Sequence, residues 1–381
     1  MTTVFELVDS YSDNANIKVI GVGGGGNNAV VHMLSKSIEG VDYICANTDA
    51  QALKKSEARI QLQIGANITK GLGAGANPEL GRQAALEDRD RIQEVISGAD
   101  MLFVTTGMGG GTGTGAAPVI AQIAKDMGIL TVAVVTRPFS FEGKKRMDQA
   151  QQGIAEMEKH VDSLIIIPND KLLTVMGKQA SLIEAFNSAN EVLYTAVQGI
   201  SELITRPGLI NLDFADVRTT MTEMGPAMMG VGIGTGENRA REAAEAAIHS
   251  PLLDDVSLTG ARGILVNITS SGDLSIGEFM EIGDVVRELA SDEATVKVGT
   301  AIDPELNGEL RVTLVATGLR RNGVVEAAPA KPRVVVSNEV RQDAPASAGP
   351  AARPAVAATA GNHALDLNFL DIPTFLRKQA D

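Results

Sequence analysis

Three glycine-rich segments, each running into a helical pattern, constrain the fold of this chain more than any other feature. They are residues 21–26 (GVGGGG), 71–78 (GLGAGANP) and 107–115 (GMGGGTGTG). Residues without a Cβ atom let the backbone approach a phosphate closely, and the helix that follows presents free N–H groups and a positive dipole end to it. If the three turns meet at one edge of a sheet, they predict a cradle for a chain of phosphates.

The first half of the chain alternates short apolar runs with helical patterns, after a polar segment, residues 1–15, that we expect to be flexible. Continuous apolar runs separated by helices indicate a parallel sheet that is covered on both faces. We therefore expect a doubly wound α/β domain over residues 16–180. Its strands are predicted at 17–22, 41–46, 101–105, 129–136 and 164–167, and its helices at 28–38, 78–96 and 142–160.

A second, smaller α/β domain is expected over residues 206–318. It follows a long helical pattern, residues 181–205, which ends at the breaker Arg206-Pro207-Gly208 and is expected to be a central helix joining two domains. The strands of the second domain are predicted at 228–233, 263–269, 295–298 and 310–316, and its helices at 239–249 and 276–289.

The last part of the chain changes character. Residues 319–363 are rich in Pro, Ala, Ser and Gly without sustained periodicity, which predicts a disordered linker. The tail, residues 364–381, regains Leu, Phe and Ile between Leu365 and Asp381. Apolar residues beyond a disordered tether usually serve a partner, so we expect the tail to bind another protein.

Composition excludes several classes of function. The chain has 33 Lys and Arg against 47 Asp and Glu, a formal net charge of −14, which argues against nucleic acid as a direct partner. The single cysteine, Cys45, excludes an internal disulfide and fits a reducing compartment. The N-terminus is unlike a secretory signal, and no apolar run approaches the roughly 20 residues that span a bilayer. We expect a cytoplasmic protein without direct membrane insertion, and the scattered histidines predict no metal site built from protein ligands.

Segment 21–26 alone also fits the G-x-G-x-x-G pattern of NAD(P)-dependent dehydrogenases. Such an enzyme needs one glycine-rich turn and an acidic residue about 20 positions further on, whereas Asp42 comes too early and Asp49 too late. The sequence also lacks the Walker A pattern G-x-x-x-x-G-K-[ST]. The three turns therefore favour a nucleoside triphosphate whose phosphates are held mainly by backbone amides.

Segment 109–115 (GGGTGTG) resembles the tubulin signature. With GVGGGGNNAV, GLGAGANPELG and NLDFADVRTTM, it makes residues 17–318 resemble the FtsZ family of bacterial cell-division GTPases, and DIPTFLRKQAD resembles that family's C-terminal peptide. The resemblance implies a pocket for GTP or GDP with Mg²⁺ on the first domain. It also implies a head-to-tail filament at the mid-cell division site beneath the membrane, in which the second domain reaches the next subunit's nucleotide. The tail would then bind membrane-tethering and regulatory division proteins.

Motif matches to the FtsZ family assign roles to individual residues. Phosphate contacts are implied for Gly24, Gly25, Gly26, Asn27, Asn28, Gly111, Thr112 and Gly113. Contacts with the γ-phosphate are implied for Ala74, Gly75 and Ala76, and contacts near it and Mg²⁺ for Asn47 and Asp49. Ribose and phosphate contacts are implied for Glu142 and Arg146, and guanine contacts for Asn169, Phe186 and Asn190. Asn27 replaces a glycine found in many relatives, and we expect it to tolerate the positive φ of that position. The pair Asn190-Glu191 replaces an Asn/Asp pair that is found in other members of the family.

Asp213 and Asp216 are the candidate catalytic residues. Spaced i, i+3 at a helix start, the two carboxylates share one face and can orient and polarise a water, directly or through a cation. The spacing alone equally suits a helix cap with an acidic first turn, and the chain would then be a non-hydrolysing, GTP-bound scaffold. The resemblance implies catalysis. Because the pair lies far along the chain from every glycine turn, we expect a neighbouring subunit to complete the site.

Overall fold

The computed structural model describes residues 15–177, 179–222, 226–253, 261–290 and 294–319. All of them belong to one compact unit, Met1–Val324. The predicted flexible segment up to residue 14, the predicted linker beyond Leu319 and the predicted partner-binding tail lie outside the described residues. No helix in the described part of the chain combines the length and hydrophobicity that crossing a bilayer requires.

Six parallel strands form the sheet of the first half, in the order β3-β2-β1-β4-β5-β6. They are β1 (Ile17–Val22), β2 (Val41–Asn47), β3 (Ile60–Gln63), β4 (Met101–Gly107), β5 (Leu130–Arg137) and β6 (Ser163–Pro168). The order runs outward from β1 in both directions, so the connection after β3 brings the chain back to the opposite side of β1. The crevice at the carboxyl ends of β1 and β4 is therefore a topological switch point, where open α/β sheets bind their ligands.

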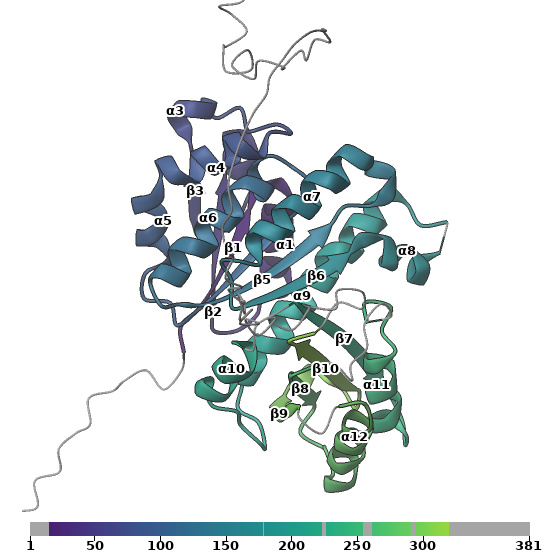
Figure 1. The fold of residues 1–381 in the computed structure, drawn as a ribbon. Coiled ribbons are helices and arrows are strands. Elements are labelled where there is room, and N and C mark those ends of the chain that lie inside the picture. Colours follow the sequence, from purple (N-terminus) through teal and green to yellow (C-terminus); the bar gives the residue numbers. More distant parts are fainter. Residues whose placement is uncertain (1–14, 178, 223–225, 254–260, 291–293, 320–381) are drawn as a thin grey trace, which may run out of the picture. The chain divides into compact units, whose positions relative to one another are not determined.

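Helices cover both faces of this sheet (Figure 1). They are α1 (Gly23–Lys36), α2 (Ala50–Lys54), α3 (Ala66–Thr69), α4 (Pro78–Glu87), α5 (Arg89–Ile96), α6 (Thr112–Asp126), α7 (Lys144–Met157) and α8 (Asn169–Met176), with a 3-10 turn, η1, at Ser140–Glu142. Alternate residues of β1 enter different cores: Ile20 and Val22 pack with α4 to α7, and Val19 packs with α1 and α9 (Leu182–Thr205). The period-two alternation explains why a strand in this position reads as a continuous apolar run.

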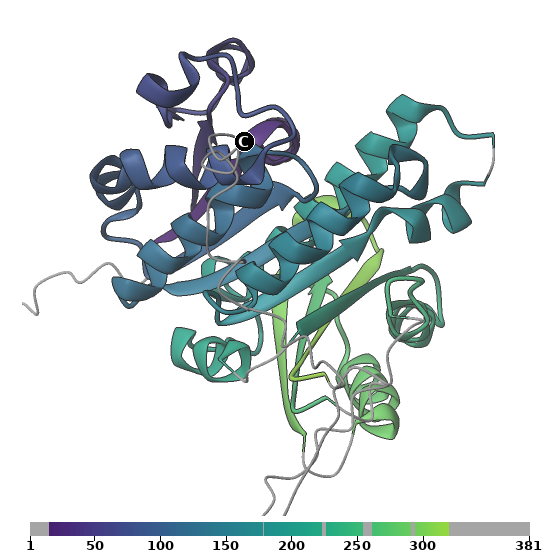
Figure 2. The same ribbon diagram turned by 45° about the horizontal axis from the view of Figure 1, so that its top comes forward.

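The second half continues the same sheet. Its elements are α10 (Phe214–Met221), β7 (Pro226–Gly234), α11 (Arg239–Ile248), β8 (Gly263–Ser270), α12 (Ile276–Leu289), β9 (Thr295–Ile302), η3 (Pro304–Leu306) and β10 (Leu310–Thr317). Strand β7 pairs in parallel with β6, and β10 pairs antiparallel with both β7 and β8, which makes one ten-stranded mixed sheet. In Figures 1 and 2 the green strands of the second half lie below the blue strands of the first.

Two helix predictions were wrong in detail. The predicted helix 78–96 is two helices, α4 and α5, because the chain leaves helical geometry at Asp88. The Asp88 carboxylate accepts a hydrogen bond from the Gly65 N–H at 2.7 Å, a contact that only the folded chain supplies. Helix α1 starts at Gly23, directly after β1, and not near Asn27.

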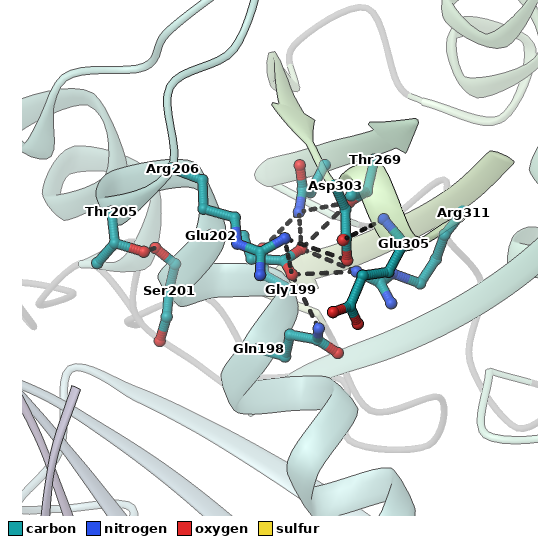
Figure 3. A network of polar contacts seen from close by, with 11 residues as sticks. Gln198, Gly199, Ser201, Glu202, Thr205, Arg206, Thr269, Asp303, Glu305 and Arg311 are labelled. Carbon is teal, nitrogen blue, oxygen red and sulfur yellow. Dashed lines mark hydrogen bonds and ion pairs between the residues drawn. The ribbon is translucent and has the colours of Figure 1, made fainter. Parts of the chain in front are cut away.

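A buried carboxylate on α9 joins that helix to the second half of the sheet. Glu202 is 1% exposed, and its two oxygens lie 3.1 and 3.0 Å from Nη2 of Arg311 on β10. Gln198 Nε2 donates to Oε1 at 2.8 Å and Thr269 Oγ1 donates to Oε2 at 3.2 Å. Figure 3 shows these groups converging on the carboxylate from α9, β8 and β10. A charge buried in this way requires its partners, so the network fixes α9 against the sheet.

Candidate functional site

The first glycine turn joins β1 directly to α1. Gly23 has a φ of 71°, in the left-handed region that side chains disfavour, which allows the strand to turn at once into the helix. No side chain of the described residues caps α1, so N–H groups of its first turn lack partners within the helix. A Cβ atom on Gly24 would meet nothing within 4 Å. The first turn therefore presents free donors to open space.

The second glycine turn joins β4 to α6 and is organised by threonine hydroxyls. The N–H of Gly109 donates to Thr114 Oγ1 at 2.8 Å, and Thr112 Oγ1 lies 2.6 Å from Thr48 Oγ1. Within the part of the chain that the structure describes, no side chain caps α6. A Cβ atom on Gly110 would meet nothing within 4 Å, so this turn also presents uncapped N–H groups beside open space.

The third glycine turn, residues 71–78, is bonded to the second. The Gly111 N–H donates to the Gly75 carbonyl oxygen at 2.9 Å. The Asn77 side chain caps α4, accepting from two backbone N–H groups of that helix. Ala74 is buried at 5% exposure, whereas Gly75 and Ala76 are exposed. The third turn is thus anchored at Ala74 and exposes Gly75 and Ala76 to solvent.

The first and second turns touch at the level of the backbone. A Cβ atom on Gly25 would lie 3.1 Å from Gly107 Cα, and one on Gly23 would lie 2.9 Å from the Gly113 nitrogen. All three turns therefore meet at the carboxyl ends of β1 and β4, as their sequence pattern predicted. Only small residues allow three backbones to approach so closely.

A cavity of about 190 Å³ opens beside the first two turns, where the start of α9 faces the end of β5. Residues singled out from the sequence line it: Gly25, Asn28, Glu142, Arg146, Asn169, Phe186 and Asn190. Asn169 is 4% exposed, and its Oδ1 has no hydrogen-bond partner among the described residues. A buried, unpaired amide oxygen is costly unless a ligand donor satisfies it. The cavity therefore fits a flat polar group with N–H donors, such as a nucleobase.

The same cavity is also lined by Gly107 and Met108 of the second glycine turn. Four further lining residues were not predicted from the sequence: Thr136, Pro138, Ala189 and Leu193. Thr136 and Pro138 lie at the carboxyl end of β5, which pairs in parallel with β4. The sequence places both residues at the end of a predicted strand, which is a common position for binding residues. Only the strand order shows that this strand end adjoins the glycine turns.

Glu142 and Arg146 form a pair within the cavity wall. Glu142 Oε1 accepts the Phe139 N–H at 2.8 Å, and Oε2 lies 3.1 Å from Arg146 Nε. The Phe139 ring meets the Phe186 ring edge-on at 5.5 Å between centroids. These contacts hold the wall between η1, α7 and α9 in place, so the pair shapes the cavity as well as lining it.

Two asparagines that were assigned to phosphate or Mg²⁺ contacts already use their side chains in hydrogen bonds within the fold. Asn27 is 4% exposed. When its amide group is oriented with the nitrogen toward the Gly21 carbonyl, Nδ2 donates to Gly21 O at 2.9 Å and Oδ1 accepts from Asn47 Nδ2 at 3.1 Å. Asn47 Oδ1 accepts the Asp49 N–H at 3.2 Å. The expected positive φ at Asn27 was wrong, because the residue lies inside α1 and Gly23 makes the turn.

Asp49 caps α2 through one oxygen and leaves the other toward the third turn. Its Oδ1 accepts from the N–H groups of Gln51 and Ala52 at 2.8 and 3.0 Å, and a Cβ atom on Gly73 would lie 4.0 Å from Oδ2. No cluster of three or more metal-binding side chains occurs within the described ranges. One carboxylate oxygen beside phosphate turns fits Mg²⁺, which commonly combines one or two carboxylates with phosphate oxygens and water.

The acidic pair lies at the opposite edge of the sheet. Asp213 caps α10, its Oδ1 accepting the Asp216 N–H at 2.8 Å, and Asp216 Oδ1 lies 2.7 Å from Lys297 Nζ on β9. Arg218 of the same helix donates to the Gly128 carbonyl oxygen at 2.9 Å. Gly128 follows the C-terminal end of α6, a helix of 15 residues, roughly 22 Å, whose other end is the second glycine turn. Neither aspartate lines the cavity of its own chain.

Comparison with known proteins identifies the family to which this fold belongs. The family model for the GTPase domain of the Tubulin/FtsZ family matches residues 16–177, and the model for the C-terminal domain of the FtsZ family matches residues 225–320. The three glycine turns lie within the matched GTPase domain, so the chain contains a GTPase domain of the tubulin type.

Full-length relatives narrow the assignment. The chain is 60% identical to the cell division protein FtsZ of Pseudomonas aeruginosa over 99% of this chain and 100% of that protein. It is 59% identical to that of Coxiella burnetii over 99% and 92%. A solved FtsZ dimer from M. jannaschii covers 84% of this chain and 95% of its own, with 43% identity and a TM-score of 0.77. The chain belongs to the FtsZ family of cell-division GTPases, and the dehydrogenase alternative finds no support.

Proposed function

We propose that this GTPase completes its active site between two copies of the chain. The glycine turns and the base cavity hold GTP, and Asp213 and Asp216 of the next copy act on its γ-phosphate. The observation that supports this proposal is the separation of the two halves within one chain. Helix α9 has 24 residues, roughly 36 Å, and runs from the cavity at its start to Thr205, shortly before Asp213. In Figure 1, α10 and α8 lie on opposite sides of α9.

The proposed binding mode follows the donors of the site. Uncapped N–H groups at the starts of α1 and α6, including those of Gly24 to Gly26, Thr112 and Gly113, would hold the phosphates. The Gly111 N–H already donates to the Gly75 carbonyl oxygen, so Gly111 would contribute close backbone approach and not a donor. The exposed Gly75 and Ala76 would face the γ-phosphate. Guanine would occupy the cavity, where its N–H groups would satisfy the unpaired Oδ1 of Asn169.

The proposed reaction is attack of a water on the γ-phosphorus, with GDP as the leaving group and no covalent enzyme intermediate. The N–H groups of the turns stabilise the charge that spreads over the phosphoryl oxygens. A bound Mg²⁺, with Asp49 as its carboxylate ligand, would neutralise part of the phosphate charge. The carboxylates of Asp213 and Asp216 orient the water and accept its proton.

A site shared in this way predicts assembly. The surface with the acidic pair differs from the surface with the turns, so their contact is heterologous and extends head to tail into a filament. In a dividing cell, such filaments would form the division ring at mid-cell. The tail, from Leu365 to Asp381, would recruit membrane-tethering and regulatory proteins, which would bring the filament to the membrane.

The first test measures GTP turnover per molecule against protein concentration. A shared site predicts turnover near zero at low concentration, a threshold, and then a rise. Turnover that is constant down to the lowest concentrations would contradict the proposal. The Asp216→Asn variant should lose about 100-fold in turnover above the threshold, the low end of the range for a positioned acid or base.

A subunit-mixing experiment tests the sharing directly. In the Gly110→Val variant, the new side chain occupies the open space beside the second turn, where a Cβ meets no protein atom, and should block phosphate binding without disturbing the fold. This variant keeps its acidic pair, whereas Asp216→Asn keeps its nucleotide pocket. Mixing the two inactive variants should restore turnover if the site is shared, and should not if each chain uses its own residues.

Gly283→Ala is the matched control for the glycine substitution. Gly283 lies in α12, far along the chain from the turns, and a Cβ there also meets nothing within 4 Å. The control should bind GTP and turn it over like the unmodified chain. Loss of GTP binding in both variants would indicate that added side chains act through folding and not through the pocket.

A further inference from the structure

The carboxylate of Asp216 is held by a cation from a distant part of the chain. Lys297 Nζ lies 2.7 Å from Asp216 Oδ1, and the two side chains are 34% and 37% exposed. Asp216 stands in the first turn of α10, whereas Lys297 lies on β9. Because the residues belong to different elements, the pair forms only when α10 is docked on the sheet.

The strand that carries Lys297 is fixed from one side by a regular ladder. β9 pairs with β8 in parallel over its whole length, and Lys297 stands opposite Leu265 in that register. Leu265 is buried in the core shared with α9 and with Val217 of α10. The ammonium group therefore projects from a rigid strand, and its position relative to α10 is set by the fold.

The hydrogen bonds of the acidic pair leave one oxygen on each carboxylate unused within the described part of the chain. Asp213 Oδ1 accepts the Asp216 N–H at 2.8 Å, and Asp216 Oδ1 faces Lys297. Fixing Oδ1 of Asp216 selects one rotamer and so directs Oδ2. A carboxylate that must reach another molecule's substrate gains from such preorganisation.

We propose that Lys297 is a positioning residue for GTP hydrolysis: it orients Asp216 and offsets its charge as the acidic pair approaches the next copy's nucleotide. This inference rests on the proposed function, in which Asp213 and Asp216 act in trans. Two carboxylates approaching a polyanionic triphosphate repel it, and the repulsion is strongest where the contact excludes water. An ammonium group 2.7 Å from one carboxylate reduces that repulsion.

The test compares three single variants. Lys297→Met removes the charge but keeps an unbranched side chain, and turnover per assembled subunit should fall about fivefold, or ~1 kcal/mol of transition-state stabilisation. Lys297→Arg keeps a donor and should stay within about twofold of the unmodified chain. Lys159→Met breaks another exposed pair, in which Lys159, just beyond the end of α7, lies 2.6 Å from Glu156 of that helix, and should leave turnover unchanged.

A double-mutant cycle separates positioning from general stability. In Asp216→Asn chains the amide no longer needs a cation, so adding Lys297→Met should cause no further loss of turnover. If Lys297→Met alone leaves turnover unchanged or raises it, or if its effect is the same in both backgrounds, Lys297 does not act through Asp216. Thermal unfolding of each variant checks that the chain is folded.

The same variants distinguish failure of this inference from failure of the proposed function. Full turnover in Asp216→Asn would remove the acidic pair from the reaction and refute the proposed function. Loss of turnover in Asp216→Asn, together with normal turnover in Lys297→Met, would refute only the role of the lysine.

Discussion

The buried carboxylate of Glu202 allows a direct test of what holds α9 to the second half of the sheet. Replacing Arg311 with Met removes the guanidinium whose Nη2 contacts both carboxylate oxygens at 3.1 and 3.0 Å. Among the described residues one further cation, Arg206, pairs with Glu202: its Nη1 lies 3.7 Å from Oε1 and also pairs with Asp303 at 3.1 Å. The variant therefore keeps a carboxylate at 1% exposure with weaker compensation.

Removing one partner of a buried ion pair typically costs about 3–5 kcal/mol of folding free energy. Because Arg206 and neutral donors remain, and because the Arg311 side chain is 13% exposed, we expect about 2–3 kcal/mol for Arg311→Met, measured by urea unfolding. The double variant with Glu202→Gln should recover at least half of that loss, since the amide needs no counter-charge. A loss below about 0.5 kcal/mol for Arg311→Met, typical of a surface pair, would refute the assignment of a compensated buried charge.

Three further predictions concern the nucleotide site and the fold around it. Gln149 Nε2 donates to the carbonyl oxygen of Ala76, which we place beside the γ-phosphate, at 3.0 Å. Gln149→Met should therefore weaken the binding affinity for GTP about fivefold in calorimetric titration. The affinity for GDP, which lacks the γ-phosphate, should stay unchanged. A hydrogen bond from Arg239 lowers the pKa of Glu278 from 4.5. The resulting stability is present above that value and is lost as pH falls through the lowered pKa, so Glu278→Gln should flatten the urea stability profile below about pH 5; an unchanged slope would contradict this. A Cβ atom on Gly115 would lie 1.8 Å from a carbonyl oxygen of α4, so Gly115→Ala should destabilise the chain by at least about 3 kcal/mol in urea.

Elements with strong apolar periodicity could be predicted from the sequence. The predicted helix 276–289 is α12 with the same bounds, and the predicted strand 17–22 is β1. β3, at Ile60–Gln63, was missed because a strand of four residues, of which only Leu62 is buried, carries little pattern. The break at Asp88 was missed because its cause is a hydrogen bond to Gly65, which is distant in sequence.

The candidate site divides in the same way. The three glycine turns were predictable, since a run of small residues before a helix has few other uses. The residues of the cavity beside the turns could be predicted only by motif resemblance, because its walls come from elements far apart in the sequence, among them η1, α7, α8 and α9. The structural roles of Asn27 and Asp49 could not be predicted from the sequence pattern. Asn27 is buried against β1, and Asp49 caps α2.

By itself the sequence determined the local rules: which segments are strands or helices, and where the backbone can turn tightly enough to approach phosphates. The tertiary structure decided what those segments face. Strand order brings three turns to one edge of the sheet and places Asp213 and Asp216 at the other, because parallel strands direct all their carboxyl ends to the same side. It also supplied Lys297 to Asp216, since a contact between residues 81 positions apart depends on how the elements pack.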